Sequence, residues 1–446
     1  MAKIAFIGAG SYGFTRRLVG DIVTYEAMRD AELAFMDIDR PRLGRARTVV
    51  GELLRSQGLP QKPLFTTSRK RALEGADFVV DLVKIGMLEP SYMDLDVPKR
   101  YGLKQTIGDT SCVAGVFRGL RGMPWAIGLC RDIEQLCPRT AVVLNYTNPQ
   151  AMLVMACAAA SRVPFIGLCH SVQGTTRQVA RFLNVPYGEM TYEAAGINHM
   201  SWITRLEHKG RDLYPRLRRI VRKHGIDAPP GGPDRKPMAF LGPARLDLLN
   251  RVGYVVTESS THLPEYVPFY ARTDALIERY RVPVDQYKRN MERKAQQAEE
   301  FYQKALRGEL APPERSVEYG VQIIHAMLTD QPARVYANVM NDGLVANLPA
   351  FSAVEVACLA DRGGVHPCRF GPLPTACAAL CTMEIHVHQL AVEAILERSR
   401  RKVYQALMMD PLTHSVMTLD DIEAMVDELV DGQRRWLGRW LGRPAP

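Results

Sequence analysis

Two short polar segments hold the residue types in this chain that are best suited to chemistry. The first, Cys-His-Ser-Val at 169–172, follows an apolar run at 164–168 that is typical of a buried strand ending in a turn. The second places His199 in a polar break of the chain. A thiolate and an imidazole suit a borderline transition metal, and two protein ligands leave positions open for substrate or water. Cys169 and His199 are therefore predicted metal ligands, with a nucleophile and its base, or ordinary core residues, as the alternatives.

The N-terminus has the pattern of a dinucleotide-binding strand, turn and helix. An apolar run at 3–7 leads straight into a glycine-rich turn and then a helical stretch. Gly8 permits the tight turn, and Gly10 lets the backbone approach a diphosphate at the helix N-terminus. Asp37 lies near the end of the next predicted strand, 32–39, where a carboxylate would accept hydrogen bonds from the adenosine ribose and repel the 2′-phosphate of NADP. The pattern predicts NAD as the cofactor, with a plain glycine turn as the alternative.

The remaining elements extend this pattern to a two-part α/β protein. They are helices at 14–26, 123–136 and 288–306, strands at 76–83, 140–146, 334–340 and 353–359, and long helices within 373–410. Residues 206–240 are polar, basic and rich in Pro and Gly near 229–233, which predicts a mobile loop or lid. The expected fold has a Rossmann-like doubly wound parallel sheet in residues 1–165. An α+β domain with a mixed sheet follows in 166–446, as in lactate and malate dehydrogenases, for metal, substrate and oligomer contacts.

Several polar residues fall where the predicted strands end. Asn145 and Asn148 belong to an Asn-Tyr-Thr-Asn-Pro segment, and Cys169 and His170 follow the next strand. Ligands of doubly wound sheets bind beyond the carboxyl ends of the strands. We therefore expect these four residues at one site. The polar loop that contains Asp109 could reach the nicotinamide side of that site.

Composition excludes several classes of protein. The chain has 446 residues, 47% of them hydrophobic and 24% charged, and no apolar run approaches a membrane span. Its nine cysteines form no CxxC pair, and the N-terminal residues show no signal pattern, so we expect a cytoplasmic protein with reduced thiols. The net charge of +9 is concentrated at 216–223 and 434–435 without interleaved aromatic residues, which favours solvated helix faces over nucleic-acid binding.

These motifs resemble glycoside hydrolase family 4, whose members are NAD- and Mn²⁺-dependent glycosidases. The resemblance covers nearly the whole chain, in the segments 7–11, 36–39, 145–149, 167–174, 195–200, 256–260, 341–344, 354–359 and 409–411. The Cys-His-Ser-Val sequence looks like the variant of bacterial α-galactosidases, and no separate phosphate-binding signature is seen. Gly13 departs from that pattern, in which a residue other than glycine stands there.

The resemblance implies roles for particular residues. Cys169 and His199 would bind Mn²⁺, His170 would lie near the leaving group, and either Tyr266 or Glu258 would take the proton from C2 of the sugar. The residues assigned to NAD are Gly8, Gly10, Ser11, Asp37 and Asn145, and those assigned to substrate are Asn148 and Asp109.

The resemblance also implies a mechanism and a substrate. NAD⁺ would take hydride from C3, Mn²⁺ would polarise the ketone, a base would remove the C2 proton, and the leaving group would be eliminated before water adds and the hydride returns. The expected substrate is a small α-galactoside, and the expected assembly is a homodimer or homotetramer. The alternatives are an α-glucosidase, an α-galacturonidase, a 2-hydroxy acid dehydrogenase and a binding protein that kept the NAD fold.

Overall fold

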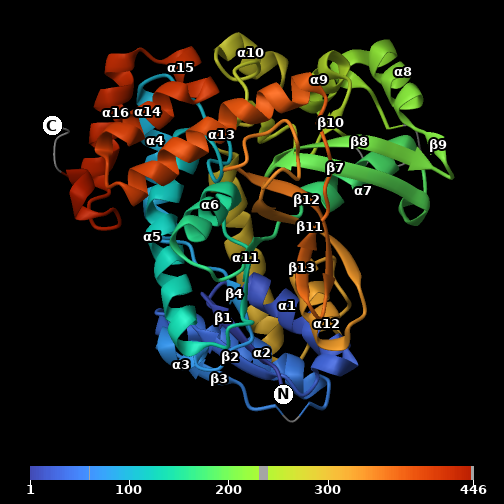
Figure 1. The fold of residues 1–446 in the computed structure, drawn as a ribbon, viewed down its shortest axis with the longest axis vertical. Helices are drawn as coiled ribbons and strands as arrows, with labels where there is room; N and C mark the ends of the chain where they lie inside the picture. The colour runs from blue at the N-terminus through green and yellow to red at the C-terminus, as the bar shows by residue number, and fades with distance from the viewer. Residues whose placement is uncertain (60, 231–239, 443–446) are drawn as a thin grey trace.

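The structure, a computed structural model, describes residues 1–59, 61–230 and 240–442 (Figure 1). Its N-terminal strands are β1 (Lys3–Ile7), β2 (Glu32–Met36), β3 (Leu64–Thr66), β4 (Phe78–Asp81), β5 (Val142–Asn145) and β6 (Phe165–Gly167). The later strands are β7 (Met190–Ile197), β8 (Met200–His208), β9 (Arg211–Asp212), β10 (Val255–Val256), β11 (Ala333–Met340), β12 (Ala353–Asp361) and β13 (Gly364–Pro367). Within the described residues they form one 13-stranded sheet.

Helices cover both faces of this sheet. The first are α1 (Tyr12–Thr24), α2 (Arg40–Ser56), α3 (Arg69–Leu73), α4 (Glu89–Arg100), α5 (Cys112–Leu136), α6 (Gln150–Ala160), α7 (Ser171–Leu183) and α8 (Tyr214–His224). The others are α9 (Pro243–Val252), α10 (Asp274–Arg279), α11 (Gln286–Leu306), α12 (Tyr319–Thr329), α13 (Thr375–Leu396), α14 (Arg400–Met409), α15 (Pro411–Val416) and α16 (Leu419–Gly432). In the described part of the chain, no helix combines the length and hydropathy needed to cross a membrane.

The N-terminal half of the sheet is doubly wound, as predicted. Its strands lie in the order β3-β2-β1-β4-β5-β6, and all of these pairs are parallel. This is the strand order of dinucleotide-binding folds. The central strands are short apolar runs because helices bury them on both faces: Ile4–Ile7, for example, are fully buried. The carboxyl ends of β1, β4, β5 and β6 consequently share one edge.

The second half of the sheet is mixed, which confirms the expected fold class. Strand β6 pairs with β5 in parallel and with β11 antiparallel, and β12 then joins β11 to β7. One sheet therefore runs through the expected domain boundary at 165, and the division into two domains stays a prediction. Figure 1 shows the C-terminal helices α13 to α16 gathered beside α4 and α5.

Two predicted segments differ from the structure. The helix expected at 123–136 begins eleven residues earlier, at Cys112, because Pro124 lies inside α5 and does not mark its first turn. The loop expected from 206 onward instead continues as β8, β9 and α8. The α8 stretch has buried Tyr214, Leu217 and Val221 at helical spacing, a pattern obscured by its many arginines. Part of the Pro- and Gly-rich segment, residues 231–239, lies outside the described residues.

Candidate active site

The turn between β1 and α1 has the features that a dinucleotide needs. Gly8 adopts a φ of +85°, and the Gly10 N–H donates to Asp37 Oδ2 at 2.8 Å. A Cβ atom on Gly10 would lie 2.5 Å from that same carboxylate oxygen. Helix α1 has no side-chain cap at Ser11 and no acidic residue in its first turn, so its N-terminus is suited to an anion. The geometry fits NAD, and the contact between Asp37 and the ribose stays a prediction.

Gly10→Ala is expected to weaken NAD⁺ binding about tenfold or more. The added methyl group forces either the turn or Asp37 to move, and overpacking of this kind costs about 1–3 kcal/mol. Gly13→Ala is the matched control because a Cβ atom there would meet nothing within 4 Å. Calorimetric titration of NAD⁺ into both variants measures the difference. Equal affinities for NAD⁺ in the two variants would place the cofactor elsewhere.

The two predicted asparagines after β5 have different surroundings. Asn145 is fully buried, and its side-chain amide donates to Thr147 O at 2.8 Å and to Gln150 Oε1 at 2.6 Å. These bonds hold the turn that presents Asn148, whose Nδ2 donates to Asp109 Oδ2 at 3.1 Å. The structure therefore brings Asn148 and Asp109 together as expected. A contact between Asn145 and the cofactor stays a prediction.

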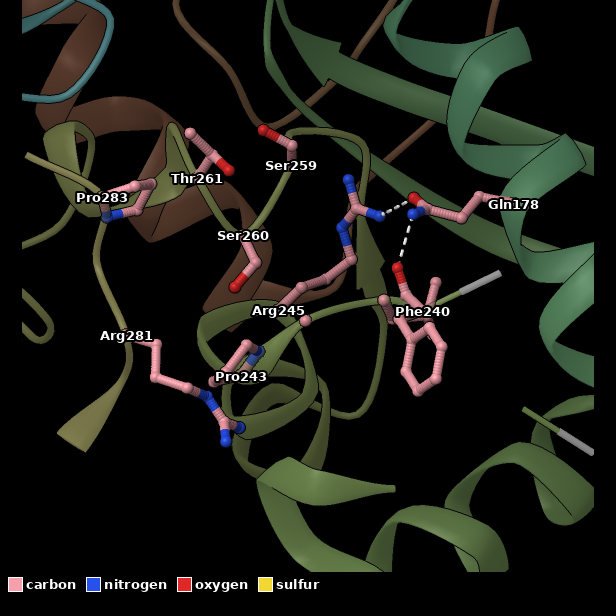
Figure 2. A pocket seen from close by; sticks show the side chains of 11 residues that line it. Gln178, Phe240, Pro243, Arg245, Ser259, Ser260, Thr261, Arg281 and Pro283 are labelled. Carbon is pink, nitrogen blue, oxygen red and sulfur yellow. Dashed lines mark hydrogen bonds between the residues drawn. The ribbon is translucent and has the colours of Figure 1, made fainter. Parts of the chain in front are cut away.

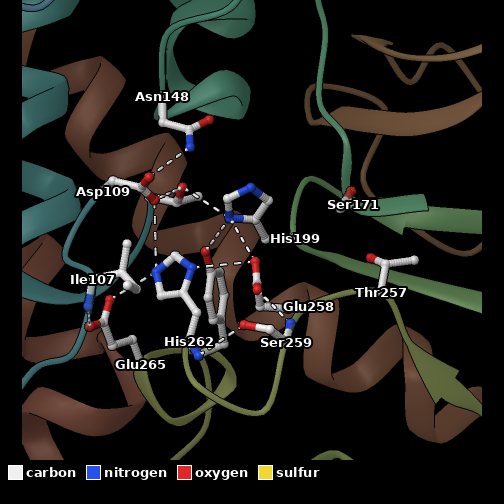
Figure 3. A network of polar contacts seen from close by, with 12 residues as sticks. Ile107, Asp109, Asn148, Ser171, His199, Thr257, Glu258, Ser259, His262 and Glu265 are labelled. Carbon is white, nitrogen blue, oxygen red and sulfur yellow. Dashed lines mark hydrogen bonds and ion pairs between the residues drawn. The ribbon is translucent and has the colours of Figure 1, made fainter. Parts of the chain in front are cut away.

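A cluster of metal-ligand types lies beside this turn (Figure 3). Asp109, His199 and His262 each offer one ligand atom, and these atoms lie within 4.8 Å of one another. Cys169 and His199 lie close enough for each to shift the pKa of the other, so the two predicted ligands are neighbours. Thiolate, imidazole and carboxylate together suit a divalent transition metal, so the donor set fits Mn²⁺. Both polar atoms of the Asn198 side chain are buried and have no partner among the described residues, which leaves them for a bound group.

The predicted bases Tyr266 and Glu258 also face this cluster. His199 Nδ1 lies 2.9 Å from the Tyr266 phenol oxygen and 3.0 Å from Glu258 Oε2, and His262 Nδ1 lies 3.3 Å from the same carboxylate oxygen. Figure 3 shows the rings of His199 and His262 and the carboxylate of Glu258 converging, the first from the turn between β7 and β8 and the other two from the segment after β10. Apart from His170, described below, the predicted catalytic and metal residues therefore share one place.

Charge dominates the protonation of this cluster. Burial disfavours the imidazolium of His199, but the negative charges of Cys169 and Glu258 outweigh burial and raise its pKa to about 10. Burial alone would raise the pKa of Glu258, but the two histidines lower it to about 2. A bound divalent cation would take the place of these protons, because metal ligands must be neutral imidazole, thiolate and carboxylate.

A buried carboxylate fixes the loop that carries Asp109. Glu265 is fully buried and accepts hydrogen bonds from the N–H groups of Thr106, Ile107 and Gly108, the latter two at 2.7 and 2.9 Å. It also accepts from the Thr106 hydroxyl at 2.9 Å and lies 3.0 Å from His262 Nε2. One side chain thus orients both the loop and a histidine of the cluster.

A buried arginine fixes the segment that carries Glu258. Arg245 is 2% exposed, and its Nε donates to Glu258 O at 2.7 Å while Nη2 lies 3.3 Å from Thr257 O. Figure 2 shows Arg245 and Gln178 beside a pocket of about 490 Å³ that lies behind this segment. The guanidinium therefore holds the backbone of the segment that carries Glu258.

His170, next to the predicted metal ligand Cys169, belongs to an ion-pair network that reaches α1, the helix that follows the cofactor turn. Its Nε2 lies 2.7 Å from Glu318 Oε2, and Glu318 Oε1 accepts from Arg17 Nη1 at 2.9 Å. Burial opposes the charged ring, but Glu318 outweighs burial and raises the pKa of His170. Arg17 lies on α1, and the ring of Phe14 on the same helix is 6.1 Å from the His170 ring.

Sequence reasoning did not assign His262, Glu265, Arg245 or Glu318 to the site. Glu258, His262 and Glu265 lie in an irregular segment and a 3₁₀ turn, where no period of the sequence marks a shared face. Their only signal was the density of polar residues after β10. Glu318 is distant in sequence from every motif, and Arg245 lies on α9, which precedes the polar segment and carries no motif of its own, so only the fold brings them close.

Comparison with known proteins identifies the family. Residues 3–185 match the model of family 4 glycosyl hydrolases, and residues 194–413 match the model of the family 4 glycosyl hydrolase C-terminal domain. The chain therefore belongs to family 4 of the glycosyl hydrolases. It is 37% identical to an α-galactosidase of Bacillus subtilis strain 168 over 441 residues, which covers 98% of this chain and 99% of that protein. It is also 33% identical to an α-galactosidase of Rhizobium meliloti strain 1021, in a match that covers 98% of this chain and 89% of that protein.

A solved structure shows the same fold. The 6-phospho-alpha-glucosidase from gut microorganisms, determined in complex with NAD and Mn²⁺, superposes with a TM-score of 0.81 at 21% identity. The match covers 98% of this chain and 99% of that one.

Proposed function

We propose that this glycosyl hydrolase is an α-galactosidase that works by reversible oxidation of its substrate, with NAD⁺ and Mn²⁺ bound at the sites described above. Two α-galactosidases at 37% and 33% identity over nearly the whole chain support the substrate class. The NAD- and Mn²⁺-bound relative supports the two cofactors.

The observation that carries the proposal is the chain of ion pairs that links α1, the helix that follows the cofactor turn, to the neighbour of the metal cysteine. Helix α1 starts at the glycine turn and reaches His170 through Arg17 and Glu318. Cys169 precedes His170 and meets His199. A hydride acceptor and a divalent cation would therefore act on one small molecule between them. Ordinary glycosidases use a pair of carboxylates for the same bond, and such a pair has no need of a nucleotide turn.

Each side chain then has a definite task. When bound, NAD⁺ would supply a hydride acceptor for C3 of the sugar, and a divalent cation held by Cys169 and His199 would supply a Lewis acid beside the C2–H bond. Asn148 and Asp109 offer an amide and a carboxylate to the sugar hydroxyls. His170, whose charged form Glu318 favours, would donate a proton to the leaving oxygen at C1. Glu265 and Arg245 hold the segments that present the cluster.

Of the two candidate bases, the surroundings favour Tyr266. Both oxygens of Glu258 are engaged, Oε2 by the two histidines and Oε1 by the Ser259 N–H. These contacts also make the Glu258 carboxylate a weak base. The rate of proton removal from carbon rises with the basicity of the group that accepts the proton. The Tyr266 phenol lies against His199, where a cation would favour its phenolate.

Tyr266→Phe is therefore expected to abolish exchange of the substrate C2 proton with solvent, whereas Glu258→Gln should retain part of it. The Phe side chain keeps the packing of the ring and removes only the proton acceptor. Exchange is followed by NMR of the sugar in D₂O. Loss of exchange in Glu258→Gln, together with its survival in Tyr266→Phe, would assign the base to Glu258.

The substrate class is tested with a panel of nitrophenyl α- and β-glycosides in the presence of NAD⁺, Mn²⁺ and a thiol reductant. The α-galactoside should be hydrolysed faster than the α-glucoside and the α-galacturonide, and β-glycosides should be slow. Preference for the α-galacturonide or the α-glucoside would replace the proposed substrate but keep the mechanism. Oxidation of a 2-hydroxy acid without glycoside hydrolysis would overturn the proposal.

A further inference from the structure

A large cleft lies where α5, the junction of α13 with α14, and the C-terminal 3₁₀ turn (Arg439–Gly442) meet. It has a volume of about 1260 Å³. Its lining residues that bear on its chemistry are Arg131, Arg398, Arg401, Arg439, Trp436 and Trp440. No active-site residue described above lines it.

The cleft carries positive charge without matching negative charge. Two further lining arginines are neutralised, Arg121 by a bidentate pair with Asp94 and Arg400 by Asp427. Arg398, Arg401 and Arg439, by contrast, form no ion pair or side-chain hydrogen bond with any described residue. The one acidic lining residue, Glu397, pairs with Lys402 at 3.0 Å.

The backbone adds to this charge. Helix α14 begins at Arg400, and Ser399, its N-cap residue, makes no capping hydrogen bond. The first turn of α14 contains no acidic residue, and Ser399, Arg400 and Arg401 all line the cleft. A helix N-terminus favours anions through its free N–H groups and its dipole. The cleft therefore combines a concave shape with two features that attract anions, the unpaired guanidinium groups and a helix N-terminus.

The apolar part of the lining narrows the class of ligand. Trp436 and Trp440 are half-buried and line the cleft, and the Arg435 guanidinium packs over the Trp436 ring at 3.9 Å from its centroid. Planar guanidinium groups bind phosphate oxygens in a bidentate manner, and indole rings pack against flat rings. We propose that this cleft binds a small molecule with two or more phosphate groups. Nucleoside polyphosphates and inorganic pyrophosphate share this chemistry.

The proposal is tested by titration of the full-length protein, saturated with NAD⁺ so that the dinucleotide turn is occupied. The probes are inorganic pyrophosphate and ATP, each without added divalent metal, followed by calorimetry and by tryptophan fluorescence. Two of the four tryptophans line the cleft, so binding should change the emission. We expect saturable binding that weakens as salt rises. Tighter binding of ATP than of pyrophosphate would assign a nucleoside to the cleft, and equal affinities would assign phosphate recognition alone.

The double variant Arg401→Gln with Arg439→Gln should weaken binding of both probes at least about tenfold, since two charge-assisted contacts are lost. Arg219→Gln is the matched control, because Arg219 is an exposed arginine on α8, outside the cleft. Circular dichroism checks that the variants fold. Absence of saturable binding, or equal affinities in the double variant and the control, would overturn the proposal. A second copy of the chain covering the cleft would also prevent binding and would overturn it.

Discussion

Replacing Cys169 with serine is expected to lower Mn²⁺ affinity and turnover at least about a hundredfold while the fold stays intact. Loss of an outer partner of a metal ligand already costs about 10–100-fold, and a ligand itself should cost no less. Burial raises the pKa of the Cys169 thiol, but His199 outweighs burial and lowers it, which favours the thiolate that a metal requires. A serine hydroxyl keeps the size but does not ionise near neutral pH.

The control for this change is Cys368→Ser, because Cys368 is an exposed free cysteine. Metal affinity is measured by calorimetry, turnover with the nitrophenyl α-galactoside, and folding by thermal unfolding. Full activity of Cys169→Ser without added metal would show that the thiol is not a metal ligand. A loss of folding in this variant alone would assign Cys169 to the core.

Glu265→Ala is expected to reduce the free energy of unfolding by about 3 kcal/mol or more. It leaves the N–H groups of Thr106, Ile107 and Gly108 without their acceptor, and each buried donor left unpaired costs about 1–3 kcal/mol. The buried charge that is removed offsets part of this cost. Because the same loop carries Asp109, Mn²⁺ affinity should fall as well.

The variant Glu265→Gln keeps the shape of the side chain and removes its charge, so it tests the two contributions to stability separately. The amide keeps one acceptor oxygen but presents an NH₂ group to backbone donors, so its stability should lie between the wild type and Glu265→Ala. Glu278→Ala, at an exposed position of α10, is the control. Denaturant unfolding gives the free energies. Unchanged stability in Glu265→Ala would mean that the loop is held by other contacts.

The sequence predicted those parts of the site in which a polar residue directly follows a regular strand. The parallel strands are continuous apolar runs, and Asn148, Cys169 and His170 follow two of them directly, so the shared edge of the sheet could be predicted. The glycine turn was readable because Gly8 and Gly10 satisfy backbone requirements that few other residues meet. These positions are set by local rules.

The rest of the site depends on tertiary contacts. His262 and Glu265 lie in a segment without helix or strand period, and their partners are the loop at 105–110 and His199. Glu318 reaches His170 across 148 residues of sequence. Helix α8 was missed for a different reason, because charged residues outnumber the three buried positions that define its inner face. No local pattern encodes contacts of these kinds.

The most direct test of the account is the fate of the C2 proton during turnover. Direct displacement at C1 leaves the C2–H bond intact, whereas oxidation followed by elimination breaks this bond and restores it with a proton that can come from solvent. We predict that α-galactoside hydrolysis in D₂O, with NAD⁺ and Mn²⁺ present, places deuterium at C2 of the released sugar, as read by NMR. A second incubation of the free sugar with the enzyme measures exchange after release. Retention of the original proton at C2 after many turnovers, with a base shown to be open to solvent, would contradict the oxidation and elimination mechanism.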